Sequence, residues 1–114
     1  MSTRCNIKVI YEDGVVFLYH HHDGYPEYVG KFLYTKFNEK IKSRRYYSPS
    51  SVVNELIKNT EDDEYEWTTA LHGDIEYLYE IDLPKKEIRC FEVKWDSEGS
   101  YIDYENPIDL SLFK

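Results

Sequence analysis

Three consecutive histidines at positions 20–22 are the residues whose type and spacing point most directly to chemistry. Alternate side chains of an extended strand share a face, so His20 and His22 are expected together and His21 opposite them. Two imidazoles on one face supply half of a zinc site. The other donors that folding could bring near are Asp23, His72 and Asp74. Dense ligand motifs such as His-Glu-x-x-His and Cys-x-x-Cys are missing, so we assign no metal ligand and keep a metal-dependent enzyme as a minor alternative.

A polar corner is expected where the strand through His21 turns into a helix that begins at Pro26. Helix N-termini attract anions, and arginine with histidine binds a phosphate or a base edge, so this corner predicts a nucleotide-type ligand. The candidate ligand-binding residues are Arg4, His21, Asp23, Tyr25, Arg44 and Arg45. A structural interpretation competes with this one and is favoured: Asp23 caps the helix, Gly24 takes a positive φ and Tyr25 packs.

Nucleophilic and acid–base catalysis find little support in the sequence. Cys5 falls on a strand face that we expect to be buried, and the chain has neither a Gly-x-Ser-x-Gly elbow nor a glycine-rich phosphate loop. Glu76 and Glu80 would share a strand face about 13 Å apart, which is too far for an acid–base pair. We therefore expect a protein that is not an enzyme, with no catalytic residue and no cofactor. Cys5 and Cys90 are expected as thiols.

The charge of the chain is concentrated in its second half. Residues 1–59 carry 9 Lys and Arg against 6 Asp and Glu, a balance of +3, whereas residues 60–114 carry 5 against 16, a balance of −11. An acidic surface repels nucleic acid and favours a partner protein with a basic surface, although solubility alone also explains such charge. The candidate partner-binding residues are Glu61, Asp62, Asp63, Glu64, Glu76 and Glu80.

Hydrophobic periodicity predicts the elements that must position these residues. Period-two alternation indicates strands, and apolar residues every three or four positions indicate helices. The expected elements in chain order are strands 5–11 and 15–21, helices 26–42 and 49–58, strands 75–83 and 88–95, and a possible short strand at 101–104. The sequence therefore predicts one domain, 1–114, of the α+β class. We expect two layers, a mainly antiparallel sheet in the order ββ-α-α-ββ with two helices on one face.

Parts of the sequence resemble a group of small phage and prophage proteins. These open S-T-R-x-x-I and carry Y-x-H-x-D-G-Y-P-E, and the matching residues here are Ser2-Thr3-Arg4, Ile7, the run 19–27 and Gly30. A weaker likeness covers residues 73–82. The resemblance implies a phage origin and carries no activity with it.

These observations lead to a functional expectation. The chain has no export signal and no apolar run that could span a membrane, so we expect it in the cytoplasm of a host cell. We expect a non-catalytic phage accessory protein that binds a host macromolecule. More specifically, we expect an anti-CRISPR-like inhibitor of a bacterial defence system that competes for a basic groove. The alternative is a small-ligand binder that sequesters a nucleotide-type signal, and the sequence leaves the oligomeric state open.

Overall fold

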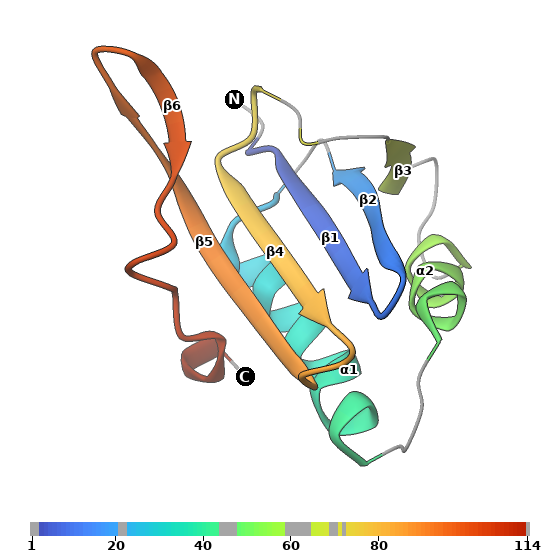
Figure 1. Cartoon of the computed structure of the whole chain (residues 1–114). Coiled ribbons are helices and arrows are strands. Elements are labelled where there is room, and N and C mark those ends of the chain that lie inside the picture. The colour runs from blue at the N-terminus through green and yellow to red at the C-terminus, as the bar shows by residue number, and fades with distance from the viewer. Residues whose placement is uncertain are drawn as a thin grey trace.

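The computed structural model describes residues 3–20, 23–43, 48–58, 65–68, 71 and 73–113, and confirms the α+β class (Figure 1). In chain order the elements are β1 (Cys5–Tyr11), β2 (Gly14–His20), the π-helix η1 (Pro26–Gly30), α1 (Lys31–Ser43), α2 (Pro49–Lys58), β3 (Tyr65–Thr68), β4 (Tyr77–Asp82), β5 (Glu87–Asp96), β6 (Gly99–Ile102) and the 3₁₀ helix η2 (Leu110–Phe113). Among these residues no helix is long and apolar enough to cross a membrane.

The described strands form one sheet in the order β3-β2-β1-β4-β5-β6. Hairpin neighbours pair antiparallel, whereas β1 and β4 at the centre run parallel. A parallel pair needs a long crossover, and the chain from β2 to β4 that contains both helices supplies it. The element order therefore differs from ββ-α-α-ββ by the two edge strands, β3 and β6.

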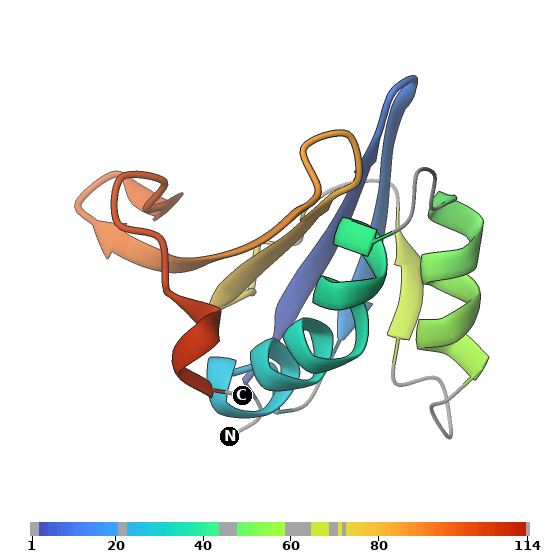
Figure 2. The same ribbon diagram turned by 90° about the horizontal axis from the view of Figure 1, so that it is seen from below.

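Alternation along the strands gives the sheet a helix-side face and an opposite face. The register places Ile7 beside both Leu18 and Tyr79, and all three side chains are fully or almost fully buried on the helix side. Helix α1 lies along this face, and its Leu33 and Phe37 are buried at the four-residue spacing that the sequence shows (Figure 2). Helix α2 contacts β1 and β3 and adds its own apolar side to the same core.

Most element boundaries agree with the sequence analysis to within two residues. Strand β1 spans the expected range, and α2 begins after Ser48, whose hydroxyl accepts a hydrogen bond from the N–H of Ser51 at 3.1 Å, as an N-cap does. Strand β3 was not expected. It has four residues beside an acidic run, too few for a clear alternation signal.

The corner between β2 and the first helix forms differently from the expectation. Asp23, not Gly24, has the positive φ, at 53°. The N-cap position belongs to Tyr25, and no side chain caps the helix start within the described residues, so the assignment of Asp23 as a cap is wrong. Gly24 is needed for close approach instead, because a Cβ there would lie 3.0 Å from the Sγ of Cys5 and from the carbonyl oxygen of Thr3.

Candidate partner-binding surface

Strands β5 and β6 extend beyond the rest of the sheet as a two-stranded arm. The pairing of β4 with β5 stops at Glu92, and residues 93–102 form a hairpin that we call the arm. It projects from the body in two perpendicular views (Figures 1 and 2). At its tip, Asp96 accepts a hydrogen bond from the N–H of Glu98 at 2.8 Å, and Gly99 has a φ of +127°, which residues with a side chain rarely adopt. Short-range chemistry therefore fixes the turn.

Large aromatic side chains are exposed on the arm. Trp95 is 66% exposed and Tyr101 is 47% exposed. Just after the arm, Tyr104 leaves half of its surface in solvent while its ring packs edge-on against Phe91 with centroids 4.9 Å apart. Exposed aromatics that gather on one feature are typical of protein-binding sites, where tryptophan and tyrosine supply much of the binding energy.

The two faces of the arm differ in chemistry. The register puts Trp95 opposite Ser100 and Val93 opposite Ile102, so these four residues share one face. At the base of that face lies a hollow of about 220 Å³ whose walls include the apolar side chains of Leu71, Ile75, Val93 and Ile102. On the other face a polar hollow of about 450 Å³ is lined by Lys94, Tyr101, Ile102, Asp103, Tyr104, Glu105 and Asn106.

The arm and its base are acidic. The exposed carboxylates are Glu76, Glu92, Asp96, Glu98 and Glu105. The single lysine of the arm, Lys94, is bound to Asp103 with a nitrogen–oxygen distance of 2.9 Å. That pairing raises the pKa of Lys94, and its hydrogen bond together with that of Asn106 lowers the pKa of Asp103, so both groups are charged and engaged. The remaining carboxylates define a negative surface.

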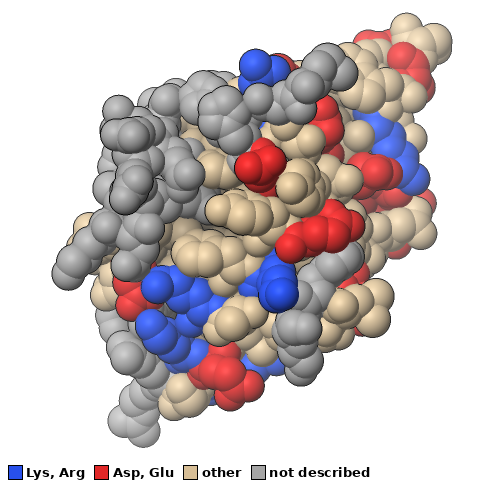
Figure 3. All heavy atoms as spheres, turned by 180° about the vertical axis from the view of Figure 1, so that it is seen from behind, with Lys and Arg blue, Asp and Glu red and all other residues tan. Residues whose placement is uncertain are grey.

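The side of the molecule that carries the helices has charges of both signs. Seen from behind, Lys and Arg side chains lie among Asp and Glu side chains, both over the helices and toward the projecting end (Figure 3). The lysines of α1 are Lys31, Lys36, Lys40 and Lys42. Lys40 is paired with Glu55 at 3.2 Å, so part of this positive charge is engaged within the chain.

The residues predicted to bind a partner are only partly in view. Glu61, Asp62, Asp63 and Glu64 lie outside the described residues. Glu76 is exposed at the base of the arm, where its carbonyl oxygen accepts a hydrogen bond from the N–H of Val93 at 2.9 Å. Glu80 is only 6% exposed and pairs with Arg89 at 3.0 Å and Lys8 at 3.7 Å. The expectation that Glu80 faces solvent is therefore wrong.

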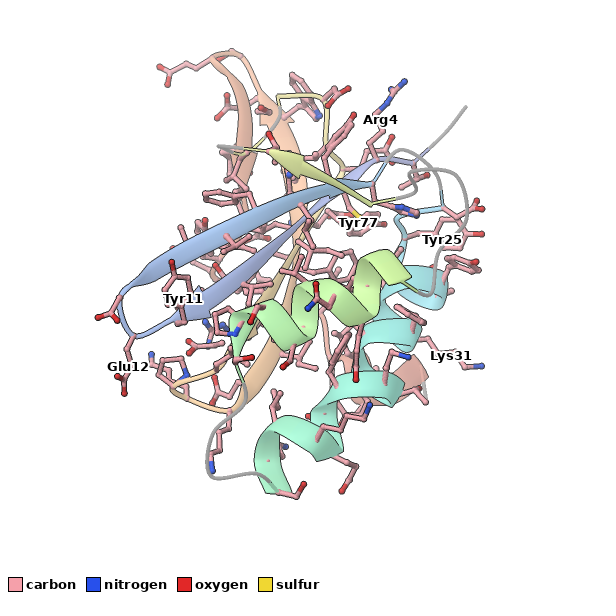
Figure 4. The ribbon with its side chains drawn as sticks, turned by 90° about the vertical axis from the view of Figure 1, so that its right-hand side faces the viewer. Arg4, Tyr11, Glu12, Tyr25, Lys31 and Tyr77 are labelled. Atoms are coloured by element: carbon pink, nitrogen blue, oxygen red, sulfur yellow. The ribbon has the colours of Figure 1, made fainter. Side chains whose placement is uncertain are left out.

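The described members of the predicted ligand site do not converge. Arg4 pairs with Asp74 at 3.5 Å, and Asp74 also accepts a hydrogen bond from the hydroxyl of Tyr19 at 2.8 Å. Arg4 lies apart from Tyr25, whose ring is 6.4 Å from that of Tyr28 (Figure 4). Asp23 is exposed, and His21, Arg44 and Arg45 lie outside the described residues. The nucleotide site at this corner therefore stays a prediction.

The two cysteines are buried thiols, as expected. Burial raises the pKa of Cys5 well above its ordinary value and the pKa of Cys90 to about 12, so neither thiol has the character of a nucleophile. The hydroxyl of Tyr79 lies beside them and donates a 2.7 Å hydrogen bond to the carbonyl oxygen of Gly24. Within the described residues no three His, Cys, Asp or Glu side chains gather as metal ligands do.

Sequence reasoning missed the arm as a site although part of its signal is visible. Phe91, Val93 and Trp95 alternate on one face of the expected strand 88–95. The structure buries Phe91 and leaves Trp95 exposed, because β5 continues past the end of its neighbour β4. Comparison with known proteins gave no match to a family model, to a curated protein or to a solved structure.

Proposed function

We propose that this protein is a non-catalytic binding protein whose arm docks on a basic surface of another protein. The observation that carries the proposal is the exposure of Trp95 and Tyr101 on a projecting hairpin edged by exposed carboxylates. Aromatic anchors provide affinity, and the surrounding charge steers the encounter and selects against acidic partners.

A basic groove that normally holds nucleic acid is the partner surface that best fits these features. Such grooves are lined with lysine and arginine that neutralise phosphates, and carboxylates on a narrow arm compete for the same cations. An inhibitor of a bacterial defence system is the specific form of the proposal. The phage-like run at residues 19–27 makes a bacterial lysate the first place to look for the partner.

The test compares two charge-reversed proteins with the wild type in pull-downs from bacterial lysate at low and high salt. In the first, Glu98→Lys and Glu105→Lys reverse exposed charges at the arm. In the matched control, Glu12→Lys and Asp13→Lys reverse two exposed charges in the turn between β1 and β2, at a separate hairpin tip (Figure 4). A protein partner is expected with the wild type and the control, and its loss with the first variant.

Two results would overturn the proposal. One is that no protein partner is recovered by the wild type at low salt, where contacts between opposite charges are strongest. The other is that both charge-reversed proteins retain the partner equally well, which would remove the arm from the interface.

A further inference from the structure

The outer edge of β6 has the properties of a surface that accepts another strand. β6 is the last strand of the described sheet, and its residues Ser100 and Tyr101 are exposed. An edge strand presents N–H and C=O groups that can pair with a further chain. Whether this edge is usable depends on which of its groups β5 already engages.

The register answers that question. In an antiparallel pair, residues that exchange both hydrogen bonds alternate with residues that exchange none. The N–H of Asp103 donates to the carbonyl oxygen of Glu92 at 3.0 Å, which marks a bonded position, and steps of two make Lys94 with Tyr101 the next one. Ser100, opposite Trp95, is therefore at a non-bonded position, and its N–H and C=O point outward from the sheet.

The faces beside this edge define which side chains an added strand should carry. Successive side chains of a strand point to opposite faces. On one face they would meet Trp95 and the apolar hollow formed by Leu71, Ile75, Val93 and Ile102. On the other face they would meet the polar hollow that includes the exposed carboxylate of Glu105.

We propose that β6 binds an extended partner segment in which apolar residues alternate with lysine or arginine, added as a further strand at Ser100. This inference rests on the proposed function and specifies how its partner is recognised. Main-chain hydrogen bonds supply affinity in such strand addition, and the alternate side chains supply specificity. A second arm is a poor occupant because its carboxylates would face those of the first, and like charges across strands destabilise pairing.

The experiment measures binding of synthetic octapeptides to the full chain by isothermal titration calorimetry. The probe is an acetylated, amidated peptide of alternating arginine and valine. A block peptide of four arginines and four valines controls for composition. Two further peptides carry N-methyl groups on one or the other alternate set of residues, so each lacks the hydrogen-bond donors of one edge without a change in charge.

Two protein variants test the edge itself. Ser100→Pro removes the outward N–H, and a proline at a non-bonded position of an edge strand leaves the pairing with β5 intact. Ser100→Ala keeps that N–H and is the matched control. We expect Ser100→Ala to bind the alternating peptide as the wild type does, Ser100→Pro to bind it at least tenfold more weakly, and the block peptide to bind at least tenfold more weakly to the wild type.

Several outcomes would overturn strand addition. They are no measurable binding of the alternating peptide to the wild type, equal binding of the block peptide, and equal binding of the peptides N-methylated on either alternate set. The peptide comparisons need no protein variant, so they decide the question even where Ser100→Pro unfolds the arm. A lysate partner that is retained by Ser100→Pro but lost on charge reversal would contradict this inference while leaving the proposed function in place.

Discussion

Acidic side chains lie in two different environments along strand β5, paired with basic residues beside β4 and exposed to solvent in the arm. Beside β4, on the sheet face away from α1, the guanidinium of Arg89 contacts Asp82 and Glu87, each at 2.8 Å, and Glu80 at 3.0 Å. Lys8 lies on the far side of Glu80. In the arm, a few residues further along, carboxylates stand in solvent with the single lysine already paired. The same residue type is structural in one region and available to a partner in the other.

This difference follows from strand neighbours. The register aligns Lys8, Glu80 and Arg89 across three adjacent strands, so opposite charges sit side by side on a partly buried face. Burial alone lowers the pKa of Arg89, but hydrogen bonds to Asp82, Glu80 and Glu87 outweigh it and raise that pKa above the ordinary value. The arm does not pair with β4, because the pairing of β4 with β5 stops at Glu92. The net charge of residues 60–114 therefore overstates the number of carboxylates that a partner can contact.

The largest expected effect is on stability, at Arg89. Arg89→Ala leaves the buried carboxylates of Glu80 and Asp82 without their main counter-charge, which should lower the free energy of unfolding by about 3 kcal/mol. Urea unfolding at neutral pH measures this. The exposed Lys85→Ala on the neighbouring turn should change it by less than about 0.5 kcal/mol. Equal losses of the free energy of unfolding in the two variants would contradict the structural role that we assign to the carboxylates around Arg89.

The second effect is on binding, at Trp95. Trp95→Ala removes a large exposed ring, so we expect the affinity for the captured partner to fall by about 30-fold or more. The free energy of unfolding should stay within about 0.5 kcal/mol of the wild type. Leu112→Ala is the control, since Leu112 is 77% exposed and lies away from the arm in η2. A destabilised Trp95→Ala protein with full affinity would reverse our interpretation of the arm.

A smaller effect is expected in association kinetics. Glu98→Gln removes one exposed charge near the tip of the arm while keeping its size and backbone, so the on-rate for the partner should fall a few-fold. The salt dependence of that rate should also weaken. Surface plasmon resonance at several salt concentrations measures both quantities. Glu12→Gln, at the other hairpin tip, should behave as the wild type, and an equal effect there would point to general steering by net charge.

The smallest effect concerns pH at the base of the arm. The pKa of Asp103 is lowered in the folded protein, so the stability that its ionised form contributes is present above its ordinary pKa and is lost as the pH falls through the folded value. The pKa of Lys94 is raised, so its contribution is present below its ordinary pKa and is lost as the pH rises through the folded value. Asp103→Asn should flatten the acid side of the urea-midpoint profile, whereas Asp13→Asn should not. Identical acid profiles would show that the pair contributes nothing.

Much of the fold could be predicted because its signals are local. The alternation of Cys5, Ile7 and Val9 defines β1, and the spacing of Leu33, Phe37 and Ile41 defines the core side of α1. Pro26 marks the start of the first helix because its missing N–H costs nothing there. Each signal depends on residues close in the chain, where backbone geometry alone fixes which side chains share a face.

Only the tertiary structure decided which residues the candidate site contains. Strand order and register are set by contacts between distant segments, and they bury Glu80 beside Arg89 while leaving Trp95 beyond the last residue that β4 pairs. The corner shows the same limit. Composition identifies a turn at Asp23 and Gly24, yet the positive φ falls at Asp23, and Gly24 lies against Cys5 of β1, which is far from this corner in the sequence. Exposure and pairing are properties of neighbours in space, and neighbours in space are what a single sequence does not specify.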